Sequence, residues 1–163
     1  MCIRDSGRAG WQLRCLFTPG HAEGHLAFYD SRHQALLAGD LLSTLVSMYV
    51  GSPGGHLETY FQSLEKIRAL DTRLLYPSHG MPTLEAETLI DKTIEHRRMR
   101  IEQVREVLLQ EPGHVLEISR RVYDHEKDSR LRPLYERTTR AALEHLVENS
   151  RARRLEEDLY EAC

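Results

Sequence analysis

The sequence TPGHAEGH, residues 18–25, decides the fold. It follows residues 11–17, where apolar and polar side chains alternate with the period of a half-buried strand. Glycines on either side of a histidine allow the tight backbone turns that aim polar side chains out of a loop. His21 therefore stands just past the end of the first predicted strand.

Two other short segments also place a polar side chain after an apolar run. In LAGD, residues 37–40, Asp40 follows a predicted strand over 35–39, and in PSHG, residues 77–80, His79 follows a predicted strand over 73–76. Strand ends are where side chains from distant parts of a sequence converge on one pocket. Two imidazoles and a carboxylate are ligands that zinc, iron and manganese accept. These segments predict one shared metal site.

The remaining patterns of residues 1–90 complete a strand, strand, strand, helix, strand order. A further apolar run over 25–29 predicts the second strand, and apolar residues at helical spacing over 57–67 predict a helix. We expect the last strand to end before Pro77.

The rest of the chain predicts three helices. An apolar stripe over 90–108 ends at Glu111-Pro112-Gly113, a second helix is expected around 115–122, and a third follows Pro133 and ends near Asn149. Three helices after an α/β segment favour a small helical or winged-helix-like module.

Composition limits the classes of function. With 163 residues, 40% hydrophobic and 29% charged, the chain has the composition of a globular protein of one domain, or one domain with an appendage. Its net charge of −3 shows no basic excess for nucleic acid, and no apolar run is long enough to span a membrane. Three cysteines without paired spacing favour a reducing, cytoplasmic location, and Cys15 is expected in the core.

Charge density divides the chain. Residues 1–90 hold 7 basic and 9 acidic side chains, whereas residues 91–163 hold 15 and 16. Met1-Cys2-Ile3-Arg4-Asp5-Ser6 matches one translated frame of a sequencing-library adapter, so we expect residues 1–10 to be non-native. The predicted units are residues 11–90 and residues 91–163, joined inside a long helix.

The three polar segments together resemble the later metal-binding motifs of the metallo-beta-lactamase-fold hydrolases, in the order of that family. The helix containing EHRR, residues 95–98, and the module after it resemble the beta-lactamase-like protein 2 branch, which ends in a winged-helix-like domain. The fold class implied is α/β: the C-terminal part of an αββα sandwich followed by that small domain.

The resemblance also implies roles for the site residues. His21 would complete the histidine cluster of a first metal, Asp40 would bridge two metals, and His79 would bind the second, while His25 would be structural. The HxHxDH motif of the family is absent, since no HxH pair occurs among the nine histidines. We therefore expect an N-terminally truncated fragment with an incomplete two-zinc site that is inactive alone.

The implied function of the intact protein is hydrolysis of an ester, thioester or phosphodiester by metal-activated water. The alternatives are a non-catalytic module that binds RNA or protein through the winged-helix-like domain, and a glyoxalase II-like thioesterase. The partner is thus a small-molecule substrate or RNA, with no membrane. The sequence does not indicate an oligomeric state.

Two further residues are weaker candidates for substrate contacts. His56 lies at the start of a predicted helix, where a solvated first-turn residue is the favoured interpretation. Arg97 lies on the apolar stripe between Ile94 and Ile101, where an ion pair between the two parts of the chain is favoured over an anion-binding role.

Overall fold

A four-stranded sheet forms the first half of the computed structural model, which describes residues 13–125 and 128–163. Its strand order is β1-β2-β3-β4, with the first two pairings antiparallel and the last parallel. The strands are β1 (Leu13–Phe17), β2 (Leu26–Asp30), β3 (Ala35–Ser43) and β4 (Leu74–His79). Trp11 and the predicted non-native segment lie outside the described residues.

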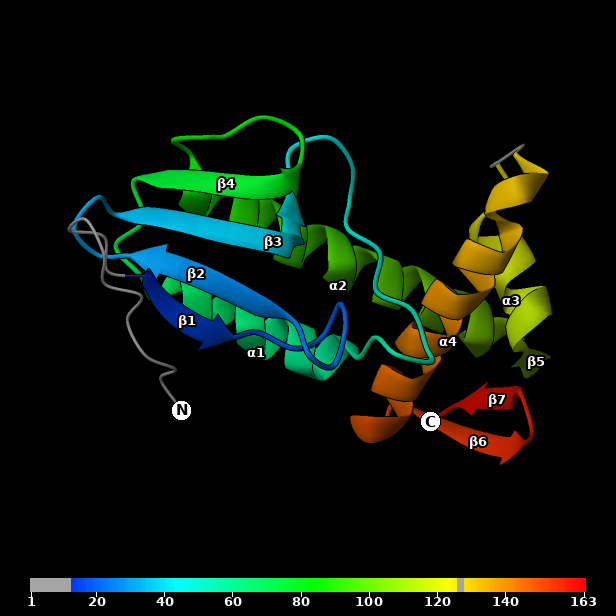
Figure 1. Cartoon of the computed structure of the whole chain (residues 1–163). Helices are drawn as coiled ribbons and strands as arrows, with labels where there is room; N and C mark the ends of the chain where they lie inside the picture. The colour runs from blue at the N-terminus through cyan, green and yellow to red at the C-terminus, as the bar shows by residue number, and fades with distance from the viewer. Residues whose placement is uncertain (1–12, 126–127) are drawn as a thin grey trace.

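Helices α1 (Leu57–Arg68) and α2 (Ala86–Gln110) lie against one face of this sheet (Figure 1). Successive side chains of a strand point to opposite faces of the sheet. Accordingly, Leu36 and Leu75 on the covered face are fully buried, whereas their neighbours Leu37 and Tyr76 are exposed. Cys15 is buried, as expected. The predicted order of strands and helix is confirmed.

Two strand ends differ from the prediction. Strand β3 continues past Gly39 to Ser43, with register shifts against β4 on either side of Gly39, and β4 continues through Pro77 to His79. Proline lacks a backbone N–H, but here it lies on the strand at the end of the four-stranded order, where an unused donor is tolerated. Asp40 and His79 therefore lie within strands, where the sequence predicted loops.

The second half contains the predicted helices and a small sheet. Strand β5 (Gly113–His114) precedes α3 (Val115–Val122), a 3₁₀ turn (Ser129–Leu131) and α4 (Arg132–Glu148), which ends at Asn149. Strands β6 (Ala152–Glu156) and β7 (Leu159–Ala162) follow, and the sheet order is β5-β7-β6, all antiparallel. A winged-helix-like assignment for these elements stays a prediction.

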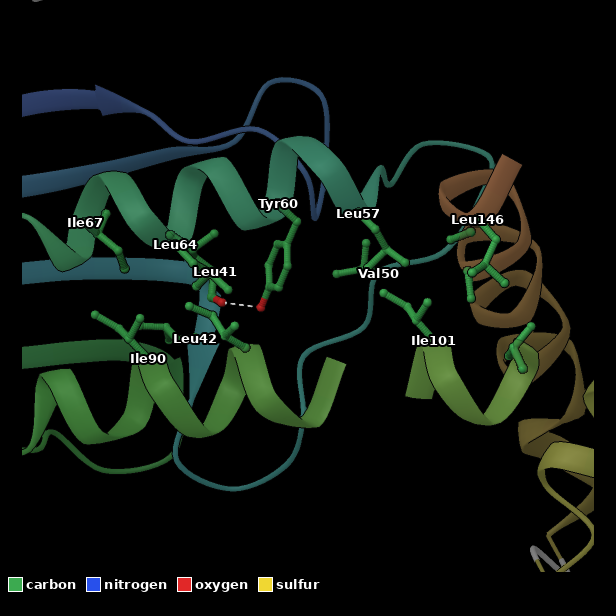
Figure 2. Packing of buried hydrophobic residues seen from close by; sticks show 14 of the residues in the cluster. Leu41, Leu42, Val50, Leu57, Tyr60, Leu64, Ile67, Ile90, Ile101 and Leu146 are labelled. Carbon is green, nitrogen blue, oxygen red and sulfur yellow. Dashed lines mark hydrogen bonds between the residues drawn. The ribbon is translucent and has the colours of Figure 1, made fainter. Parts of the chain in front are cut away.

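One hydrophobic cluster runs through both halves. Val50 and Leu57 lie near Ile101 of α2 and Leu146 of α4, at the junction between the two halves (Figure 2). Helix α2 passes through residue 90 without interruption and contributes to both ends of this core. Within the part of the chain that the structure describes, no helix is both long and apolar enough to cross a membrane.

Tyr60 is the largest fully buried side chain between α1 and the sheet. Its hydroxyl donates a hydrogen bond of 2.6 Å to the Leu41 carbonyl, drawn in Figure 2. Burial raises the pKa of Tyr60 to about 12. The tyrosine therefore stays neutral and fixes α1 to strand β3.

Gly20 lets the loop after β1 approach helix α1 closely. Its φ is +132°, and a Cβ at this position would lie 2.3 Å from the Tyr60 Cα. Its carbonyl accepts a hydrogen bond of 2.8 Å from the amide of His56, the residue before α1. A side chain at Gly20 would thus collide with backbone that cannot rotate away.

Gly20→Ala should lower the free energy of unfolding by about 3 kcal/mol, because it combines a backbone clash with left-handed strain. Urea unfolding followed by circular dichroism measures this change. Gly24→Ala is the matched control in the same loop, since its Cβ would meet no atom within 4 Å. Equal stability of the two variants would show that the close approach is wrong.

Candidate metal centre

The three predicted site residues come together at one end of the four-stranded sheet. His21 lies in the loop between β1 and β2, Asp40 lies on β3, and His79 is the last residue of β4. The Nε2 atom of His21 is 3.8 Å from Oδ2 of Asp40, and Nε2 of His79 is 3.2 Å from its Oδ1. Asp40 thus has one imidazole beside each of its oxygens.

His21 and His79 lie beside different oxygens of Asp40, so the three side chains do not surround one common point. Within residues 13–125 and 128–163, no three His, Cys, Asp or Glu side chains are grouped so that they could hold a metal ion. The side chains of Asp40 and His79 are 40% and 58% exposed, so both can be reached from solvent. The donor set is therefore open, with a carboxylate in the middle and a histidine at each side.

The peptide carbonyl of Tyr49 orients His21. The Nδ1 atom of His21 lies 2.6 Å from this oxygen, and because a carbonyl only accepts, Nδ1 carries the hydrogen. The lone pair of His21 is then on Nε2, the atom that faces Asp40. A metal-binding imidazole is commonly held by a hydrogen bond of this kind on its other nitrogen. Sequence reasoning missed Tyr49, and no signal could have found it, because any residue could supply the carbonyl.

His25 holds Asp40 by the backbone. Its Nδ1 donates to the Thr18 carbonyl at 3.0 Å, and its Nε2 accepts the Asp40 amide hydrogen at 3.1 Å. Both ring nitrogens are occupied, and burial lowers the pKa of His25, which favours this neutral form. The structure thus gives His25 the structural role that the sequence predicted.

Gly39 makes room for this contact. Its φ is +55°, and a Cβ at this position would lie 2.8 Å from Nε2 of His25. A side chain would push His25 away from the Asp40 amide. The glycine before the aspartate is therefore part of how the carboxylate is placed.

Ser78 acts on the carboxylate itself. Its hydroxyl donates to Oδ1 of Asp40, and this hydrogen bond is the main reason that the pKa of Asp40 is lowered. The neighbouring histidines lower that pKa further, whereas partial burial opposes the shift. Asp40 is consequently ionised near neutral pH, as a metal ligand must be.

The two weaker candidates lie outside this group. His56 is the N-cap of α1, with Nδ1 accepting from the Thr59 amide and Nε2 2.8 Å from Oε1 of Glu148 on α4. It is partly exposed, as expected, but it caps the helix instead of occupying its first turn.

The ion-pair interpretation of Arg97 is wrong. Arg97 is 5% exposed, and no carboxylate among the described residues lies within ion-pair distance of it. The sequence correctly predicted that Arg97 lies on the buried stripe of α2. Its polar neighbour, however, is the hydroxyl group of Tyr60 and not a carboxylate.

Comparisons with a family model, with curated proteins and with solved structures all point to the same family. Residues 9–79 match the model of the metallo-beta-lactamase superfamily. The chain is 29% identical over 125 residues to the probable metallo-hydrolase YqjP of Bacillus subtilis, covering 72% of this chain and 39% of that protein. It is 31% identical over 100 residues to the beta-lactamase-like protein 2 homolog of Caenorhabditis elegans, covering 61% of this chain and 32% of that protein.

A solved structure matches over the whole length of the chain. The metallo-beta-lactamase family protein TTHA1429 of Thermus thermophilus superposes with a TM-score of 0.85 at 29% identity, covering 100% of this chain and 52% of that one. The chain thus spans about half of this structure and less than half of the two curated relatives. The match over residues 9–79 and this structural likeness identify a metallo-beta-lactamase superfamily domain in the chain, whose sheet and helices match a portion of that fold.

Proposed function

We propose that this chain is a segment of a metal-dependent hydrolase, and that Asp40 lies between two metal positions. The observation that carries the proposal is the placement of one imidazole Nε2 beside each carboxylate oxygen of Asp40. The match of residues 9–79 to the metallo-beta-lactamase superfamily model and a relative named as a probable metallo-hydrolase support it.

The residues fit divalent metal ions of the zinc class. His21 and Asp40 would hold one ion, and Asp40 and His79 would hold the other, with zinc as the proposed metal. Such ions lower the pKa of a bound water and polarise the bond under attack. A complete site needs more ligands than these three, and we propose that an HxHxDH segment outside the present sequence supplies them.

The residues of this chain prepare the site before any ligand arrives. The Tyr49 carbonyl fixes the ring of His21 with Nε2 directed at Asp40. His25 holds the Asp40 backbone, and Ser78 keeps the carboxylate in its charged form. Positions fixed in this way reduce the entropy loss of ordering the ligands on binding.

The substrate class that we propose is an ester, a thioester or a phosphodiester, each of which exposes an electrophilic carbon or phosphorus to water. We also propose that residues 91–163 form a winged-helix-like unit appended to residues 11–90, because the elements from α2 to β7 combine helices with an antiparallel sheet. Residues 91–163 carry nearly equal numbers of basic and acidic side chains, which gives no support to RNA as the substrate.

Zinc binding by the 163-residue chain should be weak and should depend on the three site residues. We expect His21→Ala and His79→Ala each to reduce the affinity for zinc at least tenfold, because each removes one of the few ligands. Isothermal titration with zinc after removal of bound metal measures this effect. The control is His125→Gln, an exposed histidine beyond α3. Equal affinity of all variants would contradict the proposal.

Catalysis should need the upstream ligands as well. A protein that joins this chain to a segment carrying HxHxDH should hydrolyse one of a model ester, thioester or phosphodiester in the presence of zinc. Asp40→Asn should then reduce kcat/KM at least a hundredfold, because the amide has one neutral oxygen where the carboxylate has two charged ones. Full activity of the Asp40→Asn variant would overturn the assigned role.

A further inference from the structure

A cavity lies between the two halves of the chain, next to the metal centre. It has a volume of about 310 Å³, and its walls come from residues 46–49 before α1, from α2, from the end of α3 and from α4. Tyr49 belongs to both places, since its peptide oxygen holds His21 and its residue lines the cavity. We call this space the α2–α4 cavity.

Basic side chains line one wall of the α2–α4 cavity, and acidic side chains line none of it. His96, Arg97 and Arg100 come from one turn of α2, and the other lining residues are apolar, aromatic or hydroxyl-bearing. Across the described ranges, neither arginine forms an ion pair with a carboxylate. The cavity therefore holds positive charge that nothing in the described chain neutralises.

Arg97 shows this imbalance most clearly. It is 5% exposed, and its Nε is buried without a hydrogen-bond partner. Tyr60 is its polar neighbour on the core side: the hydroxyl that donates to the Leu41 carbonyl can accept one hydrogen bond from the guanidinium, but it carries no opposite charge. A buried guanidinium without a carboxylate is unfavourable, because desolvation is not offset by an opposite charge. Burial accordingly lowers the pKa of Arg97.

We propose that the α2–α4 cavity binds an anionic oxyacid group, a phosphate or a carboxylate, carried by a small molecule with a flat apolar body. The planar fork of a guanidinium matches the oxygens of such groups. Ser47 lines the same wall, with its hydroxyl 3.1 Å from Nδ1 of His96, whereas the Thr138 hydroxyl already donates to the Leu134 carbonyl.

The rest of the cavity suits the flat body of the ligand. Tyr123 and Tyr135 are stacked, with ring centroids 4.3 Å apart and an interplanar angle of 11°, and Arg100 lies 4.9 Å over the Tyr123 ring. Met48 and Leu134 supply apolar surface. A free phosphate ion would leave most of 310 Å³ unfilled, whereas an aromatic ester or acid would use both the charged and the aromatic walls.

Binding of phenyl phosphate and benzoate to the metal-free chain tests this inference, with inorganic phosphate and phenol as partial probes. Metal-free protein keeps the result independent of the proposed hydrolase activity. We expect saturable binding at one site, tighter for phenyl phosphate or benzoate than for phosphate or phenol. The comparison of phenyl phosphate with benzoate identifies the anionic group.

Arg97→Met should weaken the binding of the preferred probe at least tenfold. It should also leave the melting temperature without the probe unchanged or higher, since it removes a buried charge that has no acidic partner. Arg100→Gln should weaken binding as well, and it provides a second variant if Arg97→Met does not fold.

Arg98→Gln is the matched control, because it removes the same charge from an exposed position of α2 outside the cavity. Its affinity for the probe should equal that of the unmodified chain. The inference is overturned if Arg98→Gln weakens binding as much as Arg97→Met does, or if the unmodified chain binds none of the probes.

Discussion

The hydrogen bond from the Asp40 amide to His25 is the contact on which the candidate metal centre depends. It joins the loop after β1 to the middle of β3, and it requires Gly39, since any side chain there would displace the imidazole. The same histidine returns to Thr18 through its other nitrogen. The loop that carries His21 and the strand that carries Asp40 are thus fixed to each other, which sets the separation of the two side chains.

The segment between β3 and α1 connects this centre to the rest of the molecule. Its Tyr49 carbonyl orients His21, and the next residue, Val50, is fully buried in the core beside Leu57. Residues 46–49 also form a wall of the α2–α4 cavity. One short piece of backbone therefore contacts both His21 and the space between α2 and α4.

Most of the fold could be predicted from local patterns, because strand alternation and helical spacing depend on neighbours in sequence. The proximity of His21, Asp40 and His79 could be predicted because each follows an apolar run in a recognisable segment, and their metal-binding role stays a prediction. The contact of the Tyr49 carbonyl with His21 and the lack of an acidic partner for Arg97 among the described residues could not, since both depend on how distant elements pack together. The continuation of β4 through Pro77 was missed for the same reason: a proline is tolerated where its missing donor faces no partner strand.

The histidines of the candidate metal centre have separate roles: His21 and His79 present Nε2 toward Asp40, while both nitrogens of His25 are already used. Long-range proton–nitrogen NMR spectra of the histidine side chains, recorded with and without zinc, test this separation directly. We expect zinc to shift Nε2 of His21 and His79 and to leave both His25 nitrogens unchanged in the Nδ1–H form. Zinc-dependent shifts at His25 Nε2, or none at His21 and His79, would contradict these roles.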